Sequence, residues 1–223
     1  NHKILTDLYG DLAIGGVSNR NLDTTASLPY RYKTSALCKD GYIINHKEIK
    51  DFLVKKDIPF KQESNESEIL CKLFHYHYLT VKDGMEALRL CAEGDDESPK
   101  IVGKYAALVV CGDRILAICN GRPLGCAKFA DQIFFASESA GPWSVRDDIN
   151  STNFSEYWHD IEPGTIMECS RNGIVRKTQF KESLKMCSFE WAYYSRPDSV
   201  IQGKEVGMVH RQIGKIMVPK IIE

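Results

Sequence analysis

The chain has 223 residues and a formal net charge of −1; 43% of its residues are hydrophobic and 26% are charged. This composition is typical of a globular protein with one large domain or two small ones. The balanced charge gives no electrostatic reason to expect nucleic acid or an anionic membrane as a partner. No apolar run approaches the roughly 20 residues that a membrane span needs.

The first ten residues, NHKILTDLYG, contain no initiator Met, secretion signal or transit peptide. We therefore expect a segment of a longer intracellular protein, most simply a cytoplasmic one, with an organelle as the alternative. None of the eight cysteines lies in a C-x-x-C motif, and no His lies at zinc-site spacing from a Cys pair. The cysteines are therefore expected to be reduced, buried thiols, and neither a metal nor a cofactor is expected.

The first quarter of the chain predicts three short strands, at Asp11–Val17, Ser35–Cys38 and Tyr42–Ile44. The Asp40-Gly41 pair between the last two favours a tight hairpin turn, because Gly adopts positive φ at little cost and Asp tolerates it.

Three helices are predicted next. The first follows a candidate N-cap at Asn45, the second begins at Ser64 or Asn65, and the third lies around Gly84–Ala92 before an acidic loop. The buried stripe of the second helix is expected to consist of Ile69, Leu70, Leu73, Phe74 and His77. In FHYHY, His75 and His77 resemble a metal pair, but two residues apart on a helix they point in different directions, which favours packing.

The second half predicts strands. Apolar runs of strand length occur at 104–111, 113–120 and 131–139, and Gly112-Asp113 is best explained as a hairpin turn. A further hairpin spans 164–180 with Asn172-Gly173 at its tip. Early helices followed by antiparallel strands, with no βαβ rhythm, indicate an α+β fold whose sheets are covered by helices.

Six segments occur in an order that resembles amidophosphoribosyltransferases: NESEIL, GKYAALVV, NGRPL, ASES, EPGTIM and CSFEWAYYSRPDS. The resemblance runs from about Asp11 to the C-terminus, and Ser188–Ser199 is its most specific part. It implies a class II glutamine amidotransferase domain with the Ntn-hydrolase fold, a four-layer αββα sandwich of two antiparallel sheets. It also implies a domain over residues 1–200 and a helix over 201–223 that leads into a phosphoribosyltransferase domain missing from this chain.

The family's mechanism defines the groups to look for. An N-terminal Cys attacks the glutamine amide with its own α-amine as base, and N–H groups stabilise the oxyanion. An Arg binds the substrate carboxylate, and an Asp binds the α-ammonium. The segment that carries the nucleophile is missing here, and Asn1 cannot replace a thiolate. In LAIGGVSNR, Gly16 and Ser18 stand where the family has His and Arg; Arg20 could substitute only after a shift in strand register.

The oxyanion motif H-N-G of the family corresponds to Lys39-Asp40-Gly41. Asn offers a donor N–H₂, whereas ionised Asp only accepts hydrogen bonds, and losing one oxyanion donor costs roughly 3–4 kcal/mol. At the position of the ammonium-binding Asp stands Glu66, one methylene longer. We therefore treat Gly16, Ser18, Asp40, Gly41 and Glu66 as degenerate site positions with no catalytic residue among them.

Three functional hypotheses follow. The first is a catalytically inactive domain that serves as a structural or interaction subunit, with other protein chains of an assembly as partners. The second is a fragment of an active amidophosphoribosyltransferase that releases ammonia from glutamine for purine synthesis. The third is a regulatory domain whose altered pocket binds a cation or amine through Asp40 and Glu66.

Two further features are best explained by structural roles. Cys187 matches a cysteine that binds an iron–sulfur cluster in some relatives, but a single Cys holds no cluster, so we expect a structural thiol. Trp143, Tyr157 and Trp158 are better explained as buried aromatics than as a partner surface.

Overall fold

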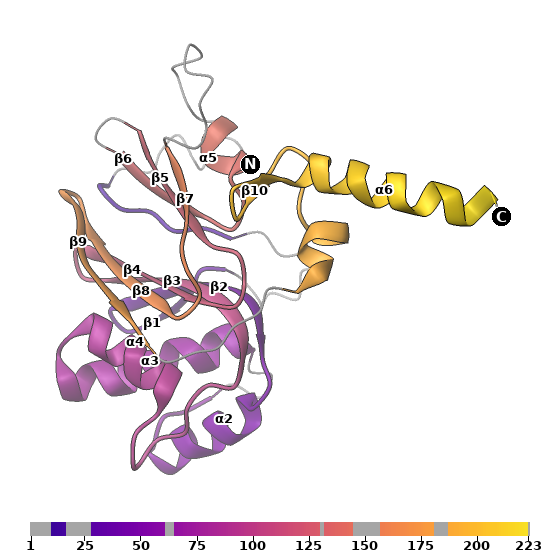
Figure 1. Ribbon diagram of the computed structural model, residues 1–223. Coiled ribbons are helices and arrows are strands. Elements are labelled where there is room, and N and C mark those ends of the chain that lie inside the picture. Colours follow the sequence, from indigo (N-terminus) through magenta and orange to yellow (C-terminus); the bar gives the residue numbers. More distant parts are fainter. Residues whose placement is uncertain are drawn as a thin grey trace.

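A six-stranded antiparallel sheet, ordered β1-β2-β3-β4-β8-β9, forms the centre of the structure (Figure 1). The structure is a computed structural model that describes residues 10–16, 28–60, 65–129, 132–144, 157–180 and 187–222. The strands of this sheet are β1 (Tyr30–Tyr32), β2 (Ser35–Ile43), β3 (Gly103–Cys111), β4 (Arg114–Asn120), β8 (Thr165–Ser170) and β9 (Gly173–Gln179).

Three helices pack on one face of this sheet, as Figure 1 shows, and enclose the main apolar core. They are α2 (His46–Lys55), α3 (Glu66–Val81) and α4 (Gly84–Glu93). Asn65 caps α3, because its Oδ1 accepts a hydrogen bond from the Glu68 N–H at 2.7 Å. The predicted apolar stripe of α3 is fully buried, so the three predicted helices and their packing face are confirmed.

A smaller sheet covers the other face of the large sheet, and a second apolar cluster lies between the two. Its order is β6-β5-β7, with bounds β5 (Gly125–Phe129), β6 (Gln132–Ala136) and β7 (Trp158–Asp160). The short helix α5 (Ala140–Ser144) follows β6. The described residues thus form a helix layer and two antiparallel sheet layers, which confirms the predicted α+β class and three of the four layers of the predicted αββα sandwich.

The C-terminal arm, residues 187–222, extends beyond the sheets in Figure 1. It contains the one-turn π-helix η3 (Glu190–Tyr194), the two-residue strands β10 (Val200–Ile201) and β11 (Lys204–Glu205), and the helix α6 (Val206–Ile222). Phe189, Tyr193 and Tyr194 expose more than half of their surface. Among the described residues, no helix is long and apolar enough to cross a membrane.

Two predicted elements at the start of the chain are wrong. Residues 10–16 form no strand, and Val17 lies outside the described residues. No turn interrupts β2 at Asp40-Gly41, because the strand pairs with β3 along its whole length, with Asp40 opposite Ala106 and Gly41 opposite Tyr105. Continuous pairing keeps Leu37 and Ile43, near the two ends of β2, on the same face of the sheet and in the main apolar core.

Most of the later strands match the prediction, including the hairpin of β8 and β9 around Asn172 and the Gly112 turn between β3 and β4. The short strands β1, β5 and β7 were missed. Strand β5 lies in GCAKF, a segment without strict alternation, and its pairing with both β6 and β7 supplies the order that its own sequence does not.

Gly41 is required in β2 for a steric reason. Its φ is +91°, and a Cβ atom there would lie 2.1 Å from the Lys104 carbonyl oxygen. We predict that Gly41→Ala lowers the free energy of unfolding by about 3 kcal/mol or more. Gly112→Ala, at φ +61° with open space around the added methyl group, should cost only about 1 kcal/mol. Urea denaturation checks both; equal losses would contradict the steric argument.

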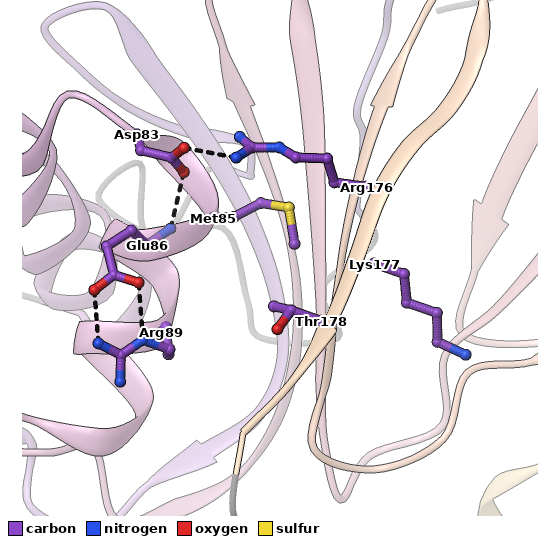
Figure 2. A pocket seen from close by; sticks show the side chains of 7 residues that line it. All are labelled: Asp83, Met85, Glu86, Arg89, Arg176, Lys177 and Thr178. Atoms are coloured by element: carbon purple, nitrogen blue, oxygen red, sulfur yellow. Dashed lines mark hydrogen bonds and ion pairs between the residues drawn. The ribbon is translucent and has the colours of Figure 1, made fainter.

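Helix α4 is joined to the edge strand β9 by an ion pair (Figure 2). The Asp83 carboxylate caps α4 by accepting from the Glu86 N–H at 3.0 Å, and it accepts from Arg176 Nη1 at 2.6 Å. The Arg176 hydrogen bond, assisted by the capping N–H groups, outweighs partial burial and lowers the pKa of Asp83. These residues and Met85, Arg89, Lys177 and Thr178 line a surface pocket of about 390 Å³.

Because the pKa of Asp83 is lowered in the folded state, the free energy of unfolding should depend on pH in the acid range. The folded state favours the ionised form, so this group stabilises the fold above its unfolded pKa of about 3.9 and the contribution disappears as the pH falls through the lower folded value. Asp83→Asn retains a capping side chain but no charge. Its free energy of unfolding should therefore decline less than that of the unmodified protein below about pH 5, in urea titrations at each pH. Parallel profiles would contradict the assignment.

Candidate functional site

The degenerate site positions lie at one end of the large sheet. Asp40 and Gly41 are in β2, and Glu66 is the first residue of α3. Gly16 ends the described segment 10–16, whereas Ser18, like Arg20, lies outside the described residues. The structure therefore brings Asp40, Gly41 and Glu66 together at β2, with Gly16 near Cys38 of the same strand. Ser18, at the position that the resemblance gives to the family's Arg, is outside the described residues.

The Glu66 carboxylate forms an ion pair with a cation of the same chain. Its Oε2 accepts from Lys39 Nζ at 2.9 Å and from the Ile43 N–H at 3.0 Å. Lys39 Nζ also donates to the Gly41 carbonyl at 2.6 Å, and its side chain is only 6% exposed. An ammonium from the neighbouring strand β2 thus already binds the carboxylate to which the resemblance assigns the ammonium of glutamine.

Asp40 is also paired. Its Oδ2 accepts from Arg122 Nε at 2.9 Å and from Arg122 Nη2 at 2.8 Å. Arg122 Nη1 bonds the Glu190 carboxylate on the other side, and the guanidinium lies 5.7 Å from the ring centroid of Tyr194. A single Arg therefore bridges β2 to the π-helix η3.

Burial and charge act in opposite directions in this cluster. Burial lowers the pKa of Arg122, but attraction to Asp40 and Glu190 outweighs it, so the net shift is upward and the guanidinium stays charged. The Glu190 side chain is 4% exposed, and burial raises its pKa although Arg122 opposes the rise. The carboxylate of Asp40, which cannot donate to an oxyanion, thus serves as a counter-ion.

No activated thiol lies near these positions in the described part of the chain. A Cβ atom on Gly16 would lie 3.1 Å from Leu28 Cδ1 and 3.7 Å from Cys38 Sγ, so a larger side chain there requires movement. Burial raises the pKa of Cys38 to about 11 and that of Cys119 to about 12. All eight cysteines are free and all but Cys187, which is half-buried, are buried. At neutral pH these are structural thiols.

The other candidate sites of the sequence behave as packing residues. His77 is buried and lies 3.3 Å from Ser98 Oγ, and burial lowers the pKa values of His75 and His77. Trp158 is buried, whereas Trp143 is 39% exposed, so the prediction of buried aromatics holds for the first and is wrong for the second. The residues with described positions contain no group of three potential metal ligands.

Sequence reasoning missed the cations that pair with these carboxylates, Lys39 and Arg122, and also Glu190, the second carboxylate on Arg122. A partial signal was present, because consecutive residues of a strand face opposite sides, so Lys39 and Asp40 had to meet different partners. The interpretation of Asp40-Gly41 as a turn concealed that alternation.

Comparison with known proteins finds similar chains that share one name. No protein-family profile matches the chain. An amidophosphoribosyltransferase of Methanocaldococcus jannaschii is 27% identical over 97% of the chain and 48% of its own length. One of Bacillus subtilis is 27% identical over 82% of the chain and 36% of its own length. The chain is related to the amidophosphoribosyltransferases. It spans about half the length, or less, of these relatives.

The fold is also similar to that of solved structures of such enzymes. The solved glutamine phosphoribosylpyrophosphate amidotransferase of B. subtilis, a complex with ADP and GMP, matches 81% of the chain and 38% of its own, with a TM-score of 0.62 and 23% identity. A structure described as the allosteric regulatory enzyme of purine biosynthesis matches 88% of the chain and 40% of its own, with a TM-score of 0.68 and 21% identity. The Ntn-hydrolase-like fold expected of an amidophosphoribosyltransferase relative is therefore confirmed.

RPDS, the end of the segment Ser188–Ser199, has a structural role in this chain. Glu138 Oε2 accepts from the Arg196 N–H at 3.1 Å and from Ser199 Oγ at 2.7 Å. Ser139 Oγ accepts from the Val200 N–H at 2.8 Å. The ASES and RPDS segments, about 60 residues apart in the chain, therefore form one hydrogen-bonded clamp between the smaller sheet and the C-terminal arm.

The Lys39–Glu66 pair can be tested against an exposed pair. Lys39→Met should lower the free energy of unfolding by about 1–3 kcal/mol, because it leaves a partly buried carboxylate without its cation. Lys56→Met breaks a pair whose side chains are 39% and 74% exposed and should cost less than Lys39→Met, because solvent screens the exposed charges. Lys39→Met/Glu66→Gln should recover part of the loss in chemical denaturation. Equal costs for Lys39→Met and Lys56→Met would contradict a structural pair.

Proposed function

We propose that the chain is a catalytically inactive glutamine amidotransferase-like domain, related to amidophosphoribosyltransferases, that serves as a structural or interaction subunit. The observation that carries the proposal is that the carboxylates at two degenerate positions are bound by cations of the same chain, Lys39 on Glu66 and Arg122 on Asp40. Stabilisation of an oxyanion would require a hydrogen-bond donor in place of Asp40. Binding of glutamine would require a carboxylate at Glu66 that no cation of the chain already binds.

The chemistry of each pair supports inactivity. An oxyanion needs N–H donors directed at the developing negative charge. The Asp40 carboxylate accepts from Arg122 and offers no proton in return. The α-ammonium of glutamine needs a free carboxylate, and Glu66 already accepts from Lys39 and from a backbone N–H. This argument is independent of what precedes Asn1 and holds even if a Cys nucleophile is supplied by a preceding segment.

The same two pairs oppose the third hypothesis. A pocket that binds a cation or amine through Asp40 and Glu66 would have to displace Arg122 and Lys39, whose side chains are 20% and 6% exposed. Displacement would break both ion pairs and leave Lys39 with the Gly41 carbonyl and Arg122 with Glu190 as their remaining partners in the cluster.

An active enzyme remains the second candidate, because every curated relative named above is an amidophosphoribosyltransferase and is at least twice as long as the matched part. In that case the partner is a phosphoribosyltransferase domain, the domain boundary lies near residue 200, and α6 leads into it. In the first case the partners are other protein chains of an assembly.

Glutamate release separates the two candidates. The full-length protein incubated with glutamine should release no glutamate above the buffer rate, and glutamine should not raise its Tm, since the site is already paired internally. The B. subtilis amidophosphoribosyltransferase serves as the positive control in the same assay. Release that a thiol-reactive glutamine analogue abolishes would contradict the proposal. Purification from the native source as an isolated monomer would contradict the interaction role.

A further inference from the structure

Polar contacts from the body of the protein hold the C-terminal arm. The clamp of Glu138 and Ser139 bonds residues 196–200, and Asp160 Oδ2 accepts from the Gln202 N–H at 2.7 Å. Within the arm, α6 is joined to η3 by His210, whose Nε2 lies 2.6 Å from the Trp191 carbonyl oxygen. The position of η3 therefore affects the position of α6.

The contact between η3 and the large sheet runs through Arg122. Glu190, the first residue of η3, is buried and bonds Arg122 Nη1. The remaining edge of the guanidinium, Nε and Nη2, is used by Asp40, and Tyr194 lies near its face. A guanidinium has a rigid planar fork of donors, so two carboxylates on its two edges fix its plane and hence the direction of both partners.

We propose that Asp40, Arg122 and Glu190 form a latch that positions the C-terminal arm on the large sheet. Asp40 is the part of this latch that the degenerate site supplies. A neutral Asn in its place would leave Arg122 with a single counter-ion, and an amide bonds a guanidinium more weakly than a carboxylate does. The Asp at position 40 thus converts an oxyanion position into an anchor for a segment about 150 residues away in the chain.

The latch determines how the arm presents its apolar surface. Phe189 immediately precedes η3, Tyr194 is its last residue, and Tyr193 is 77% exposed. Because Tyr194 lies near the guanidinium, release of Arg122 would also free this aromatic cluster to reorient. The inference holds whether or not the domain hydrolyses glutamine, so its test is separate from the glutaminase assay.

Hydrogen–deuterium exchange of the full chain tests the latch. In Asp40→Asn, amide exchange in peptides covering residues 187–205 should become about tenfold faster, the effect of losing one charge-assisted hydrogen bond of ordinary strength. Peptides covering α3 should exchange at the unmodified rate. Glu190→Gln should reproduce the effect from the other side of the guanidinium. The matched control is Asp113→Asn, which removes an exposed carboxylate beside Arg114 in the β3–β4 turn and should change neither region.

Chemical rescue distinguishes a latch from general destabilisation. In Asp40→Ala, sodium formate should slow exchange in the arm back toward the unmodified rate, because formate supplies a carboxylate to Arg122; sodium chloride at equal ionic strength should not. Unchanged exchange of the arm in both Asp40→Asn and Glu190→Gln would overturn the proposal. So would an equal acceleration in α3, or a rescue by chloride as large as that by formate.

Discussion

The unbroken pairing of β2 with β3 places two consecutive charged residues on opposite faces of one sheet. Lys39 faces the helices and meets Glu66 at the start of α3. Asp40 faces the other way and meets Arg122, which follows β4. Since strand geometry fixes this alternation, a one-residue slip of β2 would exchange the two faces and break both ion pairs. The backbone register thus determines which cation reaches which carboxylate.

Gly41 makes this register possible, and it also shows where the sequence misled. An Asp-Gly pair between apolar runs is typical of a hairpin turn, and local sequence offers no means of distinguishing that turn from a strand residue at φ +91°. The deciding constraint is the Lys104 carbonyl oxygen on β3, more than 60 residues away. By contrast, the helices were predictable because their signals are local: the Asn65 cap, and apolar residues three and four apart.

The candidate site was predictable only in part, for a similar reason. Comparing single residues with the family's motifs identified the changed groups at Asp40 and Glu66. It could not identify what those groups bind, because Arg122 and Glu190 come from segments 82 and 150 residues from Asp40 and meet it only in the folded chain. An interpretation based on one residue at a time therefore treats Asp40 as a charge that repels an oxyanion. The structure gives that charge a partner, and with it a structural role.

A cation that belongs to the same folded chain competes strongly with a free ligand for a carboxylate, because the fold holds the two groups together. Lys39 and Glu66 are held together by the fold, so the local concentration of the ammonium at the carboxylate far exceeds any concentration that free glutamine can reach. A ligand would have to compensate for the lost ion pair. It would also have to compensate for moving the Lys39 side chain, which is only 6% exposed, into solvent or for leaving its charge buried without Glu66. The same reasoning applies to Arg122, which would lose Asp40 and leave Glu190 as its one remaining carboxylate partner in the cluster. The two internal pairs are coupled, because both are built on adjacent residues of one strand. A shift in its register would replace Gly41 with a residue whose Cβ would meet the Lys104 carbonyl oxygen. The proposed loss of glutamine binding and the stability of this part of the sheet would thus have the same physical origin, the internal ion pairs built on Lys39 and Asp40.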